Sequence, residues 1–279
     1  MKNIKKGKLL LYWDYELQRG ADVSRRGCQT WGKDDFYQTK FILDLLDKYE
    51  IKATFAALGF AALEGGLPYH APEQIQEIAG CGHEIASHTW GNEWITKLSY
   101  DELKSTLSRS KKELESLTGR SVISFVPPWN APTRYLHKAA FGFYDWRGKG
   151  IPRIDIPTMC RALSETGYKT ARIGYEPLPH SLSRHILGRI IRKPDDRQLI
   201  EGVLCFKTNN GGFSHISQQI LQQAAEMGKI AVIFAHPHSL IADNNQNKRH
   251  FLSFLDIVSK LKMAGKLITT TPGEIYYDR

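Results

Sequence analysis

Two acidic side chains follow an apolar run near the N-terminus, in the sequence Tyr12-Trp13-Asp14-Tyr15-Glu16. Residues two apart in a β-strand point to the same side, so Asp14 and Glu16 can project into one site. Two carboxylates are costly to remove from water unless they share a proton, a metal ion or a cationic partner. The pair therefore predicts acid–base or metal chemistry, and the alternative is that both acids simply cap the strand among water molecules.

Two histidines occupy similar positions later in the chain. His88 closes the short segment 84–87, and His236 directly follows the apolar residues 230–235. Imidazole titrates near neutral pH, so His236 can serve as a general acid. A lone histidine is more often structural, but His88 precedes a turn that also contains Trp90, which we expect to bind substrate.

The segment Pro127-Pro128-Trp129-Asn130 closes a further apolar run. Paired prolines fix the backbone and leave the following N–H free to face a ligand. In that interpretation Trp129 stacks on a sugar ring, with Pro128 and Asn130 beside it. The commoner use of such prolines is only to end a strand.

Short apolar segments alternate with amphipathic helical patterns along the whole chain. The expected strands are residues 9–13, 53–58, 84–87, 122–126, 171–173, 202–206, 230–235 and 267–270. The helices between them have clear ends, because Ser99 and Glu102 form a capping box before a helix that stops at Gly119. Pro72 begins another helix, which stops at Gly80.

Repeated strand–helix alternation predicts parallel strands joined by right-handed crossovers. An open doubly wound sheet and a barrel both satisfy this pattern. The length of 279 residues and the polar residues at several strand ends favour a single-domain, distorted (β/α) barrel of about seven strands. The carboxyl ends of barrel strands share one rim, so the acids, the histidines and the Pro-Pro-Trp segment are expected to meet there.

Composition limits the class of protein. Hydrophobic residues make up 42% of the chain, enough for a sizeable core. No apolar run approaches the ~18 residues of a membrane-spanning helix, and the apolar residues 9–13 are too few for a signal peptide. The cysteines, which form no C-x-x-C pair, are Cys28, Cys81, Cys160 and Cys205. Free thiols and a cytoplasmic location are therefore expected.

The net charge of +9 favours anionic partners, such as a phosphate-bearing substrate or the inner face of a membrane. No nucleic-acid-binding motif accompanies the charge, so nucleic acid is not expected as a partner. Residues 182–193 combine an apolar face with flanking arginines, which fits either peripheral contact with an anionic membrane or an ordinary barrel helix. Two insertions, near 131–157 and 177–200, interrupt the alternation and have no role that the sequence identifies. The oligomeric state is equally open.

Taken in order, these segments resemble the polysaccharide deacetylase family, also called the nodulation-deacetylase-like domain or carbohydrate esterase family 4. The resemblance covers roughly residues 8–130 and 229–278, and the order of the motifs is more specific than any one of them. The D-x-E form of the first motif is similar to that of deacetylases associated with bacterial surface polysaccharide. The resemblance implies a distorted (β/α) barrel that hydrolyses an N-acyl group, most often N-acetyl, of an amino sugar. The substrate would belong to surface-polysaccharide metabolism or be nucleotide- or lipid-linked.

The resemblance also implies roles for individual residues. Asp14 matches the catalytic base, Glu16 and His88 match ligands of a divalent metal, with zinc expected, and His236 matches the acid that protonates the leaving amine. Trp129 lies in the segment whose backbone N–H would face the oxyanion. In the implied reaction a water held by the ligands and the metal gives its proton to Asp14 and attacks the acyl carbonyl.

Two positions depart from the family pattern. Asn92 stands where the H-[ST]-x-x-H motif has its second histidine, and an amide oxygen is a poorer ligand for zinc than imidazole. Val126 stands where the family has an arginine that tethers the base, and Arg134 and Arg153 are the expected replacements.

The departures keep two alternatives open. One is a metal-independent amide hydrolase acting on a non-sugar substrate, and the other is a carbohydrate-binding protein with a decayed active site. The joint presence of Asp14, Glu16, His88 and His236 argues against decay, because a dead site has no reason to keep buried charge.

Overall fold

The computed structural model describes residues 5–23, 30–135, 143–147, 149–175, 194 and 197–278. The first strand, β1 (Gly7–Tyr15), lies inside the sheet and is buried along almost its whole length. Three strands pair with β1 in parallel: β2 (Thr54–Ala57), β9 (Ile230–Ala235) and β10 (Leu267–Thr269). The two acids at the end of β1 are therefore held by a buried strand that has neighbours on both sides.

The sheet extends from β1 in both directions. The remaining strands are β3 (Glu84–Ser87), β4 (Ser124–Phe125), β5 (Thr170–Ile173), β6 (Gln198–Ile200), β7 (Val203–Lys207) and β8 (Asn210–Gly211). Their order is β6-β7-β5-β4-β3-β2-β1-β9-β8, with β10 added beside β1. Among the described strands, only β6 and β7 pair in the antiparallel sense.

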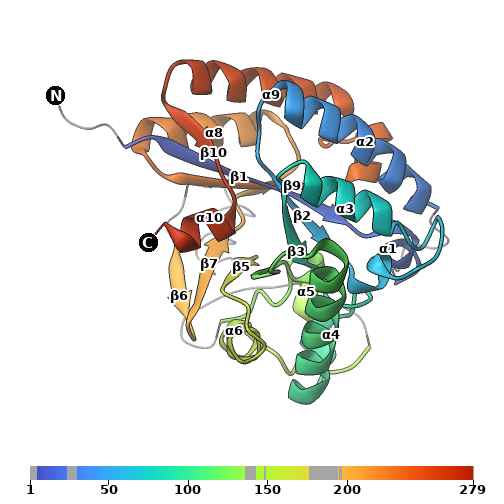
Figure 1. The fold of residues 1–279 in the computed structure, drawn as a ribbon. Coiled ribbons are helices and arrows are strands. Elements are labelled where there is room, and N and C mark those ends of the chain that lie inside the picture. The colour runs from blue at the N-terminus through green and yellow to red at the C-terminus, as the bar shows by residue number, and fades with distance from the viewer. Residues whose placement is uncertain are drawn as a thin grey trace.

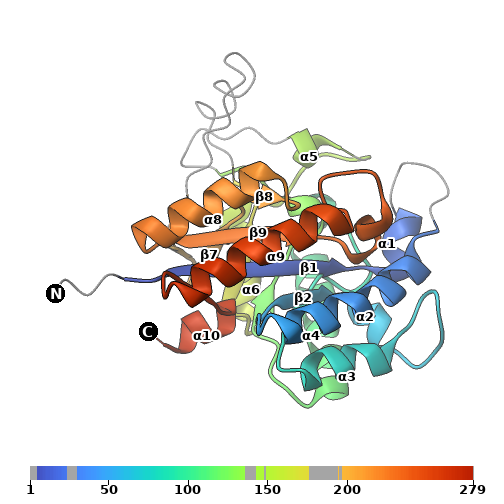
Figure 2. The same cartoon turned by 90° about the horizontal axis from the view of Figure 1, so that it is seen from above.

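The expected fold class is confirmed. Every strand expected from the sequence is present, and the mostly parallel sheet curls into part of a barrel covered by helices (Figures 1 and 2). The short strands β6 and β8 were not expected, since neither has a long apolar run. No helix in the described part of the chain has the length and apolar character needed to cross a membrane.

Helices surround the sheet, most of them on its outside, while the last one packs Ile275 against the inner side. They are α1 (Leu17–Val23), α2 (Gly32–Lys48), α3 (Pro72–Gly80), α4 (Tyr100–Thr118), α5 (Phe143–Trp146), α6 (Ile156–Glu165), α8 (His215–Met227), α9 (Lys248–Met263) and α10 (Pro272–Tyr277). The predicted ends of two helices are confirmed. A reciprocal Ser99–Glu102 capping box begins α4, which ends at Gly119 with a left-handed φ of 66°. Pro72 begins α3, which ends at Gly80.

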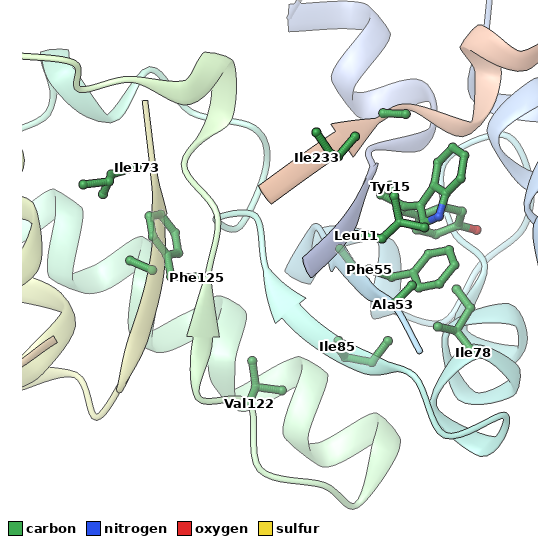
Figure 3. Packing of buried hydrophobic residues seen from close by; sticks show 14 of the residues in the cluster. Leu11, Tyr15, Ala53, Phe55, Ile78, Ile85, Val122, Phe125, Ile173 and Ile233 are labelled. Carbon is green, nitrogen blue, oxygen red and sulfur yellow. The ribbon is translucent and has the colours of Figure 1, made fainter. Parts of the chain in front are cut away.

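Alternate residues of each strand face two different clusters. Leu9, Leu11 and Trp13 belong to the large outer cluster that packs against the helices, part of which is shown in Figure 3. Leu10 and Tyr12 belong to a smaller inner cluster, which lines the concave side of the curl. Its other fully buried members from the strands are Ala56, Ala86, Val126, Leu204, Phe206 and Val232. Asp14 and Glu16 continue this inward-facing series of β1.

The two insertions differ in how much of them is described. The region 131–157 contains α5 and leads into α6, whereas residues 182–193 lie outside the described residues. The prediction of a basic amphipathic segment at 182–193 therefore stays a prediction. Among the cysteines, Cys81, Cys160 and Cys205 are free thiols, and Cys28 lies outside the described residues.

Candidate active site

Asp14 is clamped by an arginine from the far side of the sheet. Arg172, on β5, donates from Nη1 to Asp14 Oδ1 at 2.8 Å and from Nη2 to Asp14 Oδ2 at 2.7 Å. Arg172 is fully buried and Asp14 is 3% exposed. Burial by itself raises the pKa of Asp14, but the guanidinium of Arg172 outweighs burial and brings the pKa below its usual value. Asp14 is therefore an ionised carboxylate in a nearly water-free position.

Arg172 holds the position for which the sequence suggested Arg134 or Arg153, and that expectation was wrong. The backbone of Arg153 donates to Thr96 O, and Arg134 O accepts from Ile156, so both lie in the segment that precedes α6. The physical reason is the strand register. Phe125 on β4 pairs with Ala171 on β5, which places Arg172 beside Val126, where the family pattern has its arginine.

Glu16, His88 and Asn92 converge on one point. Glu16 Oε1 lies 3.2 Å from His88 Nε2, and Glu16 Oε2 accepts from Asn92 Nδ2 at 3.3 Å. The other ring nitrogen of His88, Nδ1, lies 2.8 Å from the carbonyl oxygen of Val126. All three side chains are buried. The structure thus brings together the three residues that the sequence suggested as metal ligands.

Their hydrogen bonds fit a bound divalent cation. Because a carbonyl oxygen only accepts, Nδ1 of His88 must carry a proton, and a neutral ring then turns a lone pair toward Glu16. Two acceptors 3.2 Å apart need a proton or a cation between them. Asn92 Oδ1 is also buried, and it has no hydrogen-bond partner among the residues that the structure describes. Within the described residues no three His, Cys, Asp or Glu side chains form a metal-binding group, so such a site would need the amide of Asn92.

His236 faces both acids from the end of β9. Its Nε2 lies 3.8 Å from Asp14 Oδ2 and 4.0 Å from Glu16 Oε1. Its Nδ1 lies 3.2 Å from Gln246 Oε1, an acceptor, which assigns the Nδ1 proton to that bond. Gln246 Oε1 also accepts from the backbone N–H of His236 at 2.7 Å. With Nδ1 occupied, Nε2 is the nitrogen that can carry a proton at the site.

A second carboxylate–histidine pair lies beside the first and was not found from the sequence. Asp35, in the first turn of α2, accepts from His238 Nδ1 at 2.8 Å, and the His238 ring stacks on Trp31 with centroids 4.5 Å apart. Burial by itself lowers the pKa of His238, but the charge of Asp35 outweighs it and raises the pKa above its usual value. The His-Pro-His spacing was the only sequence signal, since Asp35 lies 203 residues away.

Aromatic side chains border the site but are partly covered. One face of Trp129 stacks on Trp94, with centroids 3.8 Å apart and planes 5° apart. Trp90 has the Arg109 guanidinium 3.5 Å above its ring. Pro128 is buried, and Asn130 Oδ1 is buried without a partner among the described residues. These contacts leave the predicted roles of Trp90, Trp129, Pro128 and Asn130 in substrate binding as predictions.

The backbone around these side chains is strained. Non-glycine residues with left-handed φ follow three of the strands that supply the site, namely Leu17 after β1, Thr89 and Asn92 after β3, and Trp129 and Asn130 after β4. Such conformations each cost on the order of 1–3 kcal/mol and concentrate at functional sites. Asn92 and Trp129, two residues predicted to act in the site, both have this backbone conformation.

Comparisons with known proteins relate part of the chain to one family. Residues 33–141 match the family model described as polysaccharide deacetylase. A peptidoglycan-N-acetylglucosamine deacetylase of Listeria monocytogenes is 29% identical over 93 residues, which are 33% of this chain and 19% of that protein. Chitin deacetylase 1 of Cryptococcus neoformans is 30% identical over 33% of this chain and 18% of its own length. The matched region thus spans about a fifth of these curated relatives.

Solved structures extend the likeness of fold to the whole chain. A polysaccharide deacetylase candidate from Mycobacterium smegmatis superposes with a TM-score of 0.67 at 14% identity, covering 100% of this chain and 91% of that one. A family 4 pseudoenzyme from Bacillus anthracis superposes with a TM-score of 0.52 at 15% identity, covering 98% and 66%. The family-model match and the shared fold confirm the resemblance read from the motifs: residues 33–141 are similar to the polysaccharide deacetylase family, and the whole chain is similar in fold to solved structures named for that family.

Proposed function

We propose that the protein hydrolyses the N-acyl bond, most often N-acetyl, of an amino sugar. The observation that carries this proposal is the meeting of an ionised Asp14 with His236 Nε2, 3.8 Å apart, beside Glu16, His88 and Asn92. A base and an acid on the two sides of one polar centre suit the cleavage of an amide by water. The relatives that are named deacetylases support the same reaction.

The residues divide the proton transfers between them. Asp14 accepts the proton of the attacking water as its oxygen bonds to the acyl carbon. When the carbon–nitrogen bond breaks, Nε2 of His236 gives a proton to the departing amine. Arg172 keeps the Asp14 carboxylate charged and fixed in orientation, and Gln246 fixes the ring of His236. The products are a carboxylic acid and a free amino sugar.

We further propose that Glu16, His88 and Asn92 hold a divalent cation, zinc being the first candidate. The orphaned oxygen of Asn92 and the facing lone pairs of Glu16 and His88 support this assignment. A cation there supplies Lewis acidity toward the acyl oxygen and lowers the pKa of water.

The test measures acetate release from N-acetylated amino sugars, free and nucleotide-linked, with added zinc and with a chelator. Asp14→Asn and His236→Ala are expected to lose at least ~10³-fold in activity while circular dichroism shows a folded chain. The exposed residues Asp44 and His215 supply the matched controls Asp44→Asn and His215→Ala, which should keep full activity. Activity that survives in both Asp14→Asn and His236→Ala excludes these roles.

A carbohydrate-binding protein without turnover is the second candidate. Asn92 in the motif position of a histidine favours it, and so does the likeness of fold to a pseudoenzyme. A wild-type protein that binds N-acetylated oligosaccharides in calorimetry but releases no acetate with zinc would establish this candidate. Release of product from cyclic amides alone would instead establish a non-sugar amide hydrolase.

The cellular setting is proposed from the cysteines and the charge. We propose a cytoplasmic protein, because scattered free thiols fit a reducing compartment. We propose a phosphate-bearing sugar as its substrate, because the net charge of +9 favours anionic partners. Contact with the inner membrane surface is the variant in which the sugar is lipid-linked. Sedimentation with vesicles of increasing anionic lipid content tests this variant. If binding does not depend on the anionic lipid content, membrane contact is excluded from the proposal.

A further inference from the structure

Asp35 joins the two loops that carry the opposite halves of the site. One oxygen, Oδ2, accepts from the backbone N–H of Glu16 at 3.3 Å and of Leu17 at 2.9 Å, immediately after β1. The other oxygen, Oδ1, accepts from the backbone N–H and from Nδ1 of His238, both at 2.8 Å, immediately after β9. Asp35 itself is fully buried.

These four bonds do more than satisfy a buried acid. Its two oxygens are divided between the two loops, so neither loop can shift without losing bonds to the carboxylate. The proposed reaction depends on the separation of Glu16 and His236, because both groups face the reacting centre. Glu16 Oε1 lies 4.0 Å from His236 Nε2. A displacement of 1 Å in such an arrangement can cost on the order of 100-fold in rate.

The surroundings hold Asp35 rigidly. It lies in the first turn of α2, where the helix dipole stabilises an anion. Thr39 Oγ1 donates to the Asp35 carbonyl oxygen at 2.7 Å, and Trp31 at the helix N-terminus stacks on His238. Gly32, the next residue, lies so close to Gln18 that a Cβ would approach the Gln18 backbone nitrogen to 2.4 Å. The start of α2 is therefore packed tightly between both loops.

We propose that Asp35 is a positioning residue of this active site, which fixes the loop of Glu16 and the loop of His236 in one catalytic geometry. It acts through the backbone of Glu16 and Leu17 on one side and through His238 on the other. The inference rests on the proposed hydrolysis only for its kinetic effect, since the joining of the two loops is a property of the fold.

The first experiment does not depend on activity. Hydrogen–deuterium exchange is measured on wild type, Asp35→Asn and the matched control Asp44→Asn, an exposed position on the same helix. Asp35→Asn is expected to speed exchange in two segments far apart in sequence, around residues 14–20 and 236–241, while Asp44→Asn changes neither. Faster exchange in only one segment, or an equal rise throughout the chain, overturns the joining role.

The second experiment measures turnover. With wild-type acetate release established, Asp35→Asn should lower kcat by roughly 10- to 100-fold with KM changed less than ~2-fold, because substrate contacts are kept while the reacting groups are misplaced. An unchanged kcat with a lowered Tm identifies a purely structural residue and overturns the proposal. A wild-type protein without activity refutes the proposed function but leaves the exchange result decisive.

His238 separates positioning from direct catalysis. In His238→Asn the amide nitrogen can take the place of Nδ1 and keep the bond to Asp35, whereas His238→Phe keeps the stacking on Trp31 and loses that bond. Positioning predicts that His238→Asn retains most of kcat and His238→Phe behaves as Asp35→Asn does. Equal and complete loss in both would instead make His238 a proton carrier, and it would contradict a role limited to holding the loops.

Discussion

Two carboxylates at opposite ends of the curled sheet show what sets the charge of an acid in this fold. Asp14 lies at the carboxyl end of β1, and Glu84 lies at the amino end of β3, in step with the inward-facing Ala86. Burial raises the pKa of both side chains. The pKa of Asp14 nevertheless falls, because Arg172 donates two charged hydrogen bonds.

The hydrogen-bond donors to Glu84 in the described part of the chain are neutral. The Ser124 hydroxyl and the Gly273 N–H, the latter at 3.1 Å, donate to its carboxylate, and its pKa stays above the usual value. Glu84 lines a cavity of about 350 Å³ together with His83 and residues of α10. One arginine therefore distinguishes an acid whose pKa is lowered, which suits a catalytic base, from an acid whose pKa is raised by burial.

Removing that arginine should give the largest effect. Arg172→Met leaves Asp14 buried without its cation, and breaking such a pair costs about 3–5 kcal/mol of folding free energy. Activity is expected to fall at least ~10³-fold, while Arg172→Lys, which keeps the charge but not the two-pronged bond, should fall less. Chemical denaturation and acetate release measure the two effects.

The exposed Arg161, which pairs with Glu201 at 3.4 Å, provides the control. Arg161→Met should change neither quantity appreciably, because exposed pairs contribute little. If Arg172→Met keeps both stability and activity, the charge of Asp14 does not depend on Arg172.

How far the sequence predicts this molecule depends on whether its signals are local. The strands, the capping box before α4 and the inward-facing Asp14 and Glu16 follow from periodicity and from residues a few positions apart. The pairing of Glu16 with His88 could also be expected, since both follow parallel strands. Local patterns thus predict the fold class and the rim of the site.

Contacts that join distant segments were not predictable in the same way. Arg172 follows Ala171 in an apolar strand, and an arginine at such a position indicates a buried charge that needs a partner. The partner of Arg172, however, is Asp14, which lies 158 residues away. Asp35 resembles any acid in the first turn of a helix. Only the register of β4 with β5, and the packing of α2 against the loop after β9, turn these residues toward the site.

Replacing Asn92 by the histidine of the family pattern should strengthen cation binding beside Glu16 and His88. Asn92→His adds an imidazole at a position with a left-handed φ of 61°, a conformation in which histidine is tolerated better than most side chains. Cation affinity is expected to rise by roughly 10- to 100-fold, because imidazole is a better ligand for zinc than an amide oxygen. Competition with a chromogenic chelator measures it, with Asn92→Ala as the control. Equal zinc affinity in all three proteins would contradict a cation at this point.

The buried His83, at the amino end of the sheet, should make the stability of the fold depend on pH. Burial lowers its pKa to about 4, Asp47 opposes this and Lys52 adds to it. The unfolded chain takes up a proton near pH 6.5 while the folded chain does not, so stability is lost as the pH falls from 6.5 to about 4. At ~1.4 kcal/mol per pH unit the loss is at most ~3 kcal/mol. Urea denaturation of His83→Gln should show a flatter acid dependence, and His215→Gln should match wild type.

Replacing each of the two acids by its amide should change the stability at pH 7 in opposite directions. The raised pKa of Glu84 stabilises the fold below the usual carboxyl pKa, and this contribution is lost as the pH rises through that value toward the raised one. Glu84→Gln should therefore match wild type near pH 4 and be modestly more stable at pH 7. Asp14 has a lowered pKa, so its contribution is present at neutral pH and lost in acid, and Asp14→Asn should be less stable than wild type at pH 7. Denaturation curves at both pH values compare the two variants. A loss of stability in both at pH 7 would mean that Arg172 is not what distinguishes the two ends, because hydrogen bonding alone would then hold each carboxylate.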